Sequence, residues 1–171
     1  MIFNLFRKPA VAPDAVEEAY RSIVAQSRQV TFYADWGVPD TVTGRFDMVS
    51  LQMALFLHRM KGVAEAKPFT QALTDLFFLD MDRSVRELGV TDLGVAKKVR
   101  KMAEVFYGLV RALDPALDSG NAAELESLLV RNVFGAPNAG AAPLAKHLIE
   151  EARRLAALPA NELMHTKGVA A

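Results

Sequence analysis

The chain has 171 residues, which suits one domain, and 51% of them are hydrophobic, so most of the chain is too apolar to be intrinsically disordered. Its 20 Lys and Arg residues balance 20 Asp and Glu residues, which excludes a globally basic nucleic-acid-binding protein, and we expect no DNA partner. The sequence contains no cysteine, which excludes disulfides, thiol nucleophiles and cysteine-ligated metal sites.

Apolar residues recur at helical spacing through almost the whole chain, and no stretch alternates for long enough to predict a β-sheet. We therefore expect an all-α fold, a single compact domain of about six helices that spans residues 1–171. The ends, 1–12 and 159–171, are expected to be flexible. A loosely structured stretch is also expected at 135–142, which is rich in Gly, Pro and Asn.

The first helix is expected to begin at Asp14, where Glu17 completes a pattern similar to a capping box. Residues 30–33 are short and β-prone, and we expect the helix to continue or bend there. Pro39 disfavours helix at the residue before it, so the segment 37–41 predicts a turn.

A central helix is expected from about Phe46 to Met60, because apolar residues fall on both of its sides and it must be enclosed by other helices. The later helices are expected at about 67–88, 92–114, 121–135 and 143–158. Gly89 is expected to end the first of these with a C-terminal cap. The longest apolar-rich stretch, 48–57, is too short to cross a bilayer.

Motifs for catalysis, metals and cofactors are missing from the sequence. The three histidines, His58, His147 and His165, do not pair at the spacing of metal ligands on a helix, and we interpret His58 as a hydrogen-bonded packing residue. Asp80 and Asp82 diverge on a helix and are interpreted as surface carboxylates. We expect no enzyme, no metal and no cofactor, with a small enzyme built on an unrecognised acid–base pair as an alternative.

Two features suggest binding. Cations cluster near the start of the helix expected at 92–114, namely Lys97, Lys98, Arg100 and Lys101. Such a cluster is usually a solvated face, and its functional alternative is contact with an anionic partner such as lipid headgroups or RNA. The run of apolar residues at 76–79 points nearly all round a helix, so we expect either a fully buried helix or a cleft for apolar helices of a partner.

Several strings of residues, in this order and spacing, resemble the signature of the ubiquinol–cytochrome c chaperone family. The strings are Phe32-Tyr33, Gly37-Val38-Pro39-Asp40-Thr41, Gly44-Arg45-Phe46-Asp47-Met48, Asp80-Met81-Asp82-Arg83, Arg86-Glu87-Leu88-Gly89-Val90 and Phe106-Tyr107-Gly108. The resemblance covers about residues 20–117, which is most of the expected domain.

The resemblance implies a non-enzymatic assembly factor that binds newly made cytochrome b and supports assembly of the respiratory cytochrome bc complex. The chain shows no transit peptide, so we expect a bacterial member that is cytoplasmic and peripheral at the inner membrane. A membrane-surface or ribosome-binding adaptor without client selectivity is the alternative. Residues 2–8, which combine apolar and basic side chains, are expected either to touch a membrane surface or to fray.

The resemblance and the apolar run together nominate site residues. The candidates for client binding are Phe32, Tyr33, Arg45, Phe77 and Phe78. The four clustered cations are the candidates for contact with an anionic partner. The residues expected to serve the structure are Gly37, Pro39, Asp40, Gly44, Asp47 and Gly89. Asp40 and Asp47 are expected to cap the chain around the central helix.

Overall fold

The computed structural model describes residues 11–165, with His165 described by its backbone alone. Within this range the chain forms eight α-helices, a 3₁₀-helix and a π-helix, and no strand, which confirms the expected all-α fold. In chain order the elements are α1 (Pro13–Ser27), α2 (Val30–Ala34), α3 (Val42–Met60), the 3₁₀-helix η1 (Ala64–Ala66), α4 (Lys67–Glu87), α5 (Asp92–Ser119), α6 (Ala122–Leu129), the π-helix η2 (Val130–Phe134), α7 (Ala141–Ala156) and α8 (Ala160–His165). The short helix α8 comes in addition to the predicted ones, and α2 lies where the first helix was expected to continue or bend.

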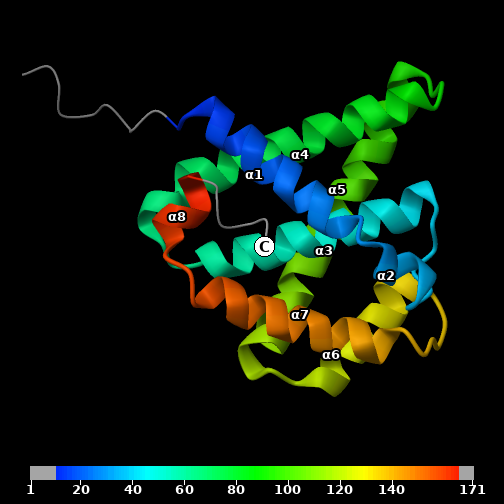
Figure 1. Cartoon of the computed structure of the whole chain (residues 1–171). Coiled ribbons are helices and arrows are strands. Elements are labelled where there is room, and N and C mark those ends of the chain that lie inside the picture. The colour runs from blue at the N-terminus through cyan, green and yellow to red at the C-terminus, as the bar shows by residue number, and fades with distance from the viewer. Residues whose placement is uncertain (1–10, 166–171) are drawn as a thin grey trace, which may run out of the picture.

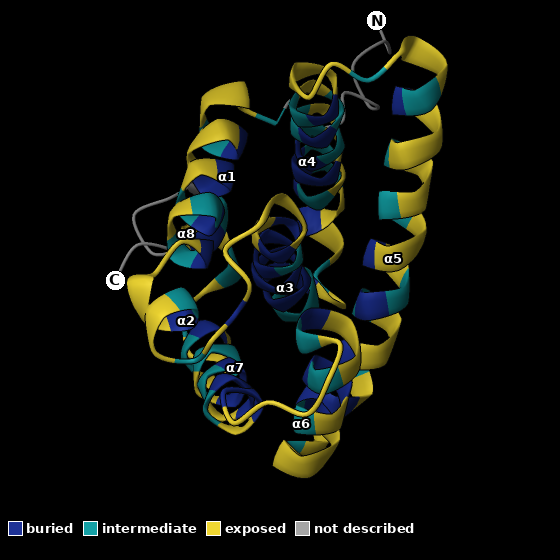
Figure 2. Cartoon of the chain, turned by 90° about the vertical axis from the view of Figure 1, so that its right-hand side faces the viewer, coloured by how far each residue is buried: buried dark blue, intermediate teal, exposed yellow. Residues whose placement is uncertain are grey.

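Helix α3 is the centre of the fold. Figure 2 shows it almost end-on, surrounded by α1, α4, α5, α6 and α7. Every residue from Met48 to Phe56 is buried, as predicted for a helix that is apolar on both sides. The surrounding helices pack their apolar faces against α3, so one continuous hydrophobic core forms around it.

The start of α3 differs from the prediction. The helix begins at Val42 because the Thr41 side chain accepts a hydrogen bond from the backbone N–H of Gly44, at 3.1 Å, and caps the first turn. The expectation that Asp40 and Asp47 act as caps is therefore wrong. Asp40 instead accepts a hydrogen bond from Arg45, and Asp47 lies inside the helix.

Aromatic rings join α3, α4 and α5 in the core. Phe77 of α4 stacks on Phe46 of α3, with ring centroids 6.0 Å apart, and contacts Phe106 of α5 at 4.9 Å. Phe77 and Phe106 have no exposed surface. Such ring pairs add to the free energy gained by burial alone, so this cluster fixes the three helices relative to one another.

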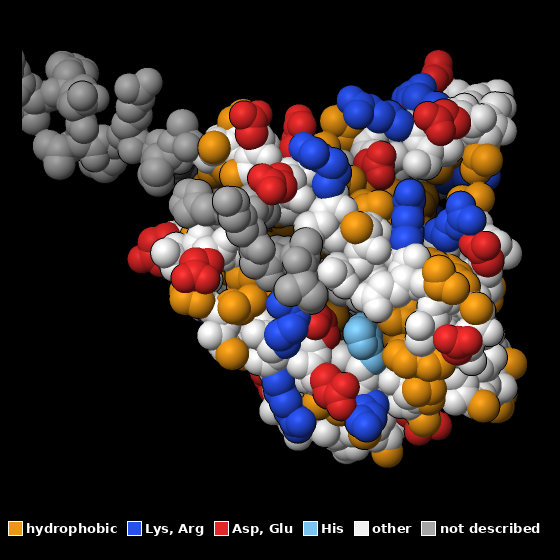
Figure 3. Space-filling view, viewed as in Figure 1, with side chains coloured by type: hydrophobic (Ala, Val, Ile, Leu, Met, Phe, Trp, Pro, Cys, Tyr) orange, Lys and Arg blue, Asp and Glu red, His pale blue; other side chains and the backbone are white. Residues whose placement is uncertain are grey.

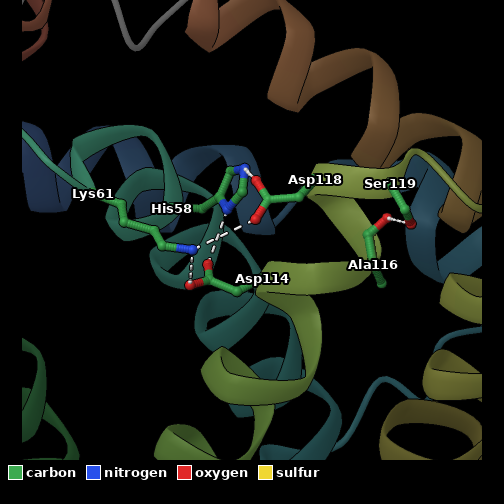
Figure 4. Close-up of polar contacts among 6 residues, drawn as sticks. All are labelled: His58, Lys61, Asp114, Ala116, Asp118 and Ser119. Carbon is green, nitrogen blue, oxygen red and sulfur yellow. Dashed lines mark hydrogen bonds and ion pairs between the residues drawn. The ribbon is translucent and has the colours of Figure 1, made fainter.

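Helix α5 continues past Pro115, where the sequence predicted its end. The lost backbone hydrogen bond is offset because Ala116 and Leu117 are buried, and because Asp114, just before the proline, is held by α3. His58 Nδ1 lies 2.9 Å from Asp114 Oδ1, and Lys61 Nζ lies 3.0 Å from Asp114 Oδ2 (Figure 4). The interpretation of His58 as a hydrogen-bonded packing residue agrees with this geometry.

The C-terminal segment is ordered further than predicted. Ala160–His165 forms α8, which packs against α1 and buries Leu163 completely, so the expected flexible end at 159–171 is wrong for these residues. Burial of Leu163 supplies the free energy that orders the segment. The expectations for residues 1–10 and 166–171, including the membrane contact proposed for 2–8, lie outside the described part of the chain.

Candidate functional site

The signature segment at 37–41 forms a tight turn that leads into α3. Gly37 has φ of 69°, in the left-handed region that favours glycine. Val38 is buried, and its N–H donates a hydrogen bond to the carbonyl oxygen of Phe32 at 3.0 Å. This hydrogen bond ties the segment to α2, and the Thr41 side chain caps the helix that follows.

Gly44 allows this turn to lie against the helix. A Cβ atom at position 44 would lie 1.9 Å from the carbonyl oxygen of Pro39, closer than any real contact. Glycine is required at this position for the turn and the first turn of α3 to approach each other. Backbone geometry thus favours glycine at positions 37 and 44. Gly89 has φ of 74° and its N–H donates to the carbonyl oxygen of Arg86, which ends α4 as predicted.

The first turn of α3 forms one wall of a groove of about 310 Å³. The last turn of α4 and the first half of α5 form the rest, beside the turn that joins these two helices (Figure 1). We call this the α3–α5 groove, and its residues are Val42, Thr43, Phe46, Asp47, Val85, Leu88, Lys98, Lys101, Met102 and Val105. It is open to solvent, so it suits a few side chains of a partner better than an enclosed small molecule.

Burial divides the α3–α5 groove into a base and edges. Phe46 and Val85 are 8% and 5% exposed and form the base. Val42, Leu88 and Val105 are 60%, 55% and 39% exposed and form apolar edges. Exposed large apolar side chains at the edge of a concave surface are typical of contact sites, because their contact with water is unfavourable in the free protein.

Asp47 is the acidic residue of the α3–α5 groove. It is half-buried, and within residues 11–165 it has no hydrogen bond or ion pair. Burial without a compensating partner raises the pKa of Asp47 to about 7. Asp47 was expected to serve the structure as a cap, but its carboxylate is the one unpaired polar group on the α3 wall that carries a charge.

The structure separates the four clustered cations. Lys98 and Lys101 line the α3–α5 groove, whereas Lys97 and Arg100 are exposed and do not line it. On the face shown in Figure 3, Lys and Arg side chains are interspersed with Asp and Glu, as expected for a chain without net charge. Lys98 and Lys101 alone therefore give the groove a local basic edge.

The candidate client-binding residues do not form one surface. Phe32 and Phe77 have no exposed surface, because they are core residues of α2 and α4. In this structure they can only support a binding surface from beneath. Phe78 is half-buried against Tyr107, with ring centroids 5.9 Å apart.

Tyr33 and Arg45 lie together in a second hollow, which has a volume of about 630 Å³. Its other lining residues are Arg28, Val30, Ala34 and Asp40. Arg45 Nε donates to Asp40 Oδ1 at 2.7 Å, and this hydrogen bond holds the pKa of Asp40 below its usual value. Arg45, a candidate for client binding, thus contacts a local carboxylate in this structure.

His147 lies on α7 in an aromatic cluster. Its ring meets Phe32 and Trp36 edge-on, with centroid distances of 5.2 and 5.7 Å. Burial lowers the pKa of His147, which favours the neutral ring in this site.

No group of three or more His, Asp or Glu residues is placed to hold a metal ion in the described range 11–165. No helix in that range is long and apolar enough to span a bilayer.

Most residues of the α3–α5 groove were missed by the sequence reasoning. Val42, Val85, Met102 and Val105 are ordinary apolar residues on three different helices, and only the fold brings them together. One signal was present in the sequence. Asp47 is the only acidic residue in α3, where it stands among apolar neighbours.

The comparisons with known proteins bear on the identity of the chain. The family model described as ubiquinol-cytochrome C chaperone matches residues 34–170. The chain belongs to the ubiquinol–cytochrome c chaperone family. The match extends beyond residue 117, where the resemblance seen in the sequence ended, and it covers all the described helices from α3 onward. No curated protein matched the chain.

A solved structure supports the same assignment. The crystal structure of the Cbp3 homolog from Brucella abortus is 38% identical in sequence, and the alignment covers 94% of this chain and 91% of that chain with a TM-score of 0.85. This chaperone-family chain therefore shares its helical fold with that protein over almost the full length of both. The α3–α5 groove is formed by helices inside the matched region.

Proposed function

We propose that this protein is an assembly chaperone that holds newly made cytochrome b in the α3–α5 groove before the cytochrome b enters the respiratory cytochrome bc complex. The groove is the observation that carries the proposal, because it exposes apolar side chains on a concave surface inside a domain of the chaperone family. The role is binding without catalysis. We further propose that the protein acts at the cytoplasmic side of the inner membrane.

The groove has the properties that reversible holding needs. Its edge residues Val42, Leu88 and Val105 gain free energy when a client covers them, at about 25 cal/mol per Å² of apolar area. The aromatic core beneath keeps its shape, since Phe46 at its base stacks on the fully buried Phe77. A preformed open groove lets an apolar client segment bind and leave without unfolding the chaperone.

The test is co-purification of cytochrome b with the tagged protein from its own cells, after brief crosslinking, with quantitative mass spectrometry. Leu88→Gln places a neutral polar group at the groove edge without adding charge beside the lysines. We expect it to lower the recovered cytochrome b roughly tenfold, the effect of losing one well-packed apolar contact. Unchanged recovery of cytochrome b by this variant would contradict the proposed site.

Leu79→Gln is the matched control. Leu79 lies on α4, the helix that Leu88 directly follows, and is 46% exposed, close to the 55% of Leu88, but it does not line the groove. It should leave the recovery of cytochrome b at the level of the unmodified protein. If cytochrome b is not enriched by any variant while it is being made, the proposed client is wrong.

The exposed cations of α5 support a second candidate function, a membrane-surface or ribosome-binding adaptor. Lys97 and Arg100 are exposed and do not line the groove, so their side chains are available to lipid phosphates or ribosomal RNA. Charge reversal at both positions should then weaken association with anionic vesicles or ribosomes and reduce its salt dependence. Association that the reversal leaves unchanged would remove this candidate.

A further inference from the structure

The α3–α5 groove combines apolar walls with one carboxylate that has no partner. Asp47 is half-buried and lines the groove, and it makes no hydrogen bond or ion pair with residues 11–165. An ionised carboxylate in such surroundings is unfavourable unless a cation or hydrogen-bond donor meets it. In the free protein the Asp47 carboxylate therefore lacks a positively charged partner.

The lysines of the groove do not supply that group. Lys98 and Lys101 are exposed on α5, and neither forms an ion pair with Asp47. Lys101 instead pairs with Glu104, with 3.6 Å between Nζ and Oε2. The end of α4 and the residue after it contribute only the apolar Val85 and Leu88, and the remaining polar residue from α3 is Thr43.

We propose that Asp47 selects client segments in which an apolar helix face carries one Lys or Arg, as at the cytoplasmic end of a membrane-spanning helix. This inference rests on the proposed function and names the part of the client that the groove holds. Charge complementarity supports it, because the apolar groove residues match the apolar face and the unpaired carboxylate matches the cation. The cytoplasmic flanks of membrane helices are generally rich in Lys and Arg.

Exposed amines at the edge do not exclude such a segment. Lys98 and Lys101 keep their hydration, so their repulsion of a second cation is weak and screened by salt. A cation that reaches Asp47 lies in less polar surroundings, where an ion pair is stronger. The inner carboxylate therefore outweighs the outer amines in the choice of partner.

The experiment measures binding of synthetic peptides to the full chain by fluorescence anisotropy. The probes are labelled Leu/Ala peptides of about 16 residues, long enough for several helical turns, with Lys, Gln or Glu at one central position. At about pH 8, above the pKa of about 7 for Asp47, we expect the Lys peptide to bind roughly tenfold more tightly than the Gln peptide. The Glu peptide should bind most weakly.

Asp47→Asn tests the residue itself. It keeps the size of the side chain and removes the charge, so we expect the protein to fold and the Lys and Gln peptides to bind equally. Asp75→Asn, at an exposed position on α4 outside the groove, should keep the preference of the unmodified protein. Lowering the pH to about 6 should reduce the preference in the unmodified protein by protonating Asp47.

Three results would overturn the inference. The first is that the Lys and Gln peptides bind the unmodified protein equally well. The second is that Asp47→Asn keeps the preference for the Lys peptide. The third is that the Glu peptide binds most tightly, which would assign selection to Lys98 and Lys101. None of them contradicts the proposed function, since cytochrome b recovery is measured separately with the Leu88→Gln variant. If Leu88→Gln recovers as much cytochrome b as the unmodified protein, the proposed function is contradicted, and the measured peptide preference is unaffected.

Discussion

Replacing Gly44 with alanine should break the junction between the 37–41 turn and α3. The added Cβ atom would lie 1.9 Å from the carbonyl oxygen of Pro39 and 3.4 Å from its Cβ atom, so the turn must move by about 1 Å to relieve the overlap. Overpacking costs about 1–3 kcal/mol, and displacement of the turn also strains the Thr41 cap, worth about 1 kcal/mol. We expect a total loss of about 3 kcal/mol in the free energy of unfolding.

The assay is urea unfolding followed by circular dichroism, with Gly108→Ala as the control. Gly108 lies within α5, and a Cβ atom there would meet nothing within 4 Å. This control should raise the free energy of unfolding by about 0.5–1 kcal/mol, because alanine favours the helix over glycine. A Gly44→Ala variant that unfolds at the same urea concentration as the unmodified protein would refute the reasoning.

Three further substitutions test other parts of the account. Asp47→Asn should raise the free energy of unfolding at about pH 8 by about 1–2 kcal/mol, after allowance for solvent screening. The folded-state pKa of about 7 makes the unmodified protein lose stability as the pH rises from about 4, and the variant has no such loss. A gain in stability that does not shrink toward about pH 4 would contradict this. The unmodified protein should lose stability as the pH falls below about 6.5, because the lowered pKa of His147 means that the unfolded chain binds a proton more readily than the folded one. His147→Phe should remove this contribution to the pH dependence. An unchanged dependence of stability on pH would contradict this. Arg59→Met should lower the free energy of unfolding by about 2–3 kcal/mol, measured in urea. The Arg59 guanidinium donates hydrogen bonds to the carbonyl oxygens of Leu155 and Leu158 at 2.9 and 2.6 Å, and the variant loses both. A loss below about 0.5 kcal/mol would contradict a stabilising role for these hydrogen bonds.

The features that the sequence predicted well are set by local chemistry. The glycine and proline at 37–41 specify a turn, and Gly89 specifies the end of α4 wherever these segments lie in the fold. Helices α3 and α7 followed from apolar periodicity, which a surrounding core demands. The ends that were missed depend on tertiary contacts, as when α5 runs past Pro115 because Ala116 and Leu117 find a place in the core.

The candidate site could be predicted only in outline. An apolar cleft was one of two expectations for the run at 76–79, and its candidate residues included the aromatic residues at 32–33 and 77–78. The structure buries Phe32 and Phe77 completely and forms the groove from single residues on three helices. Helix periodicity shows that a residue is apolar, and it does not show which neighbour covers it. Which apolar positions stay uncovered depends on how the helices pack.

The central claim is that cytochrome b lies in the α3–α5 groove, and site-specific photocrosslinking in cells that are making cytochrome b tests it most directly. A photoreactive amino acid at Val105, which lines the groove, is compared with one at Arg111, which is exposed on the same helix outside it. The account predicts a crosslink to cytochrome b from position 105 and none above background from position 111. Equal crosslinks from both positions, or a crosslink from position 111 alone, would contradict it.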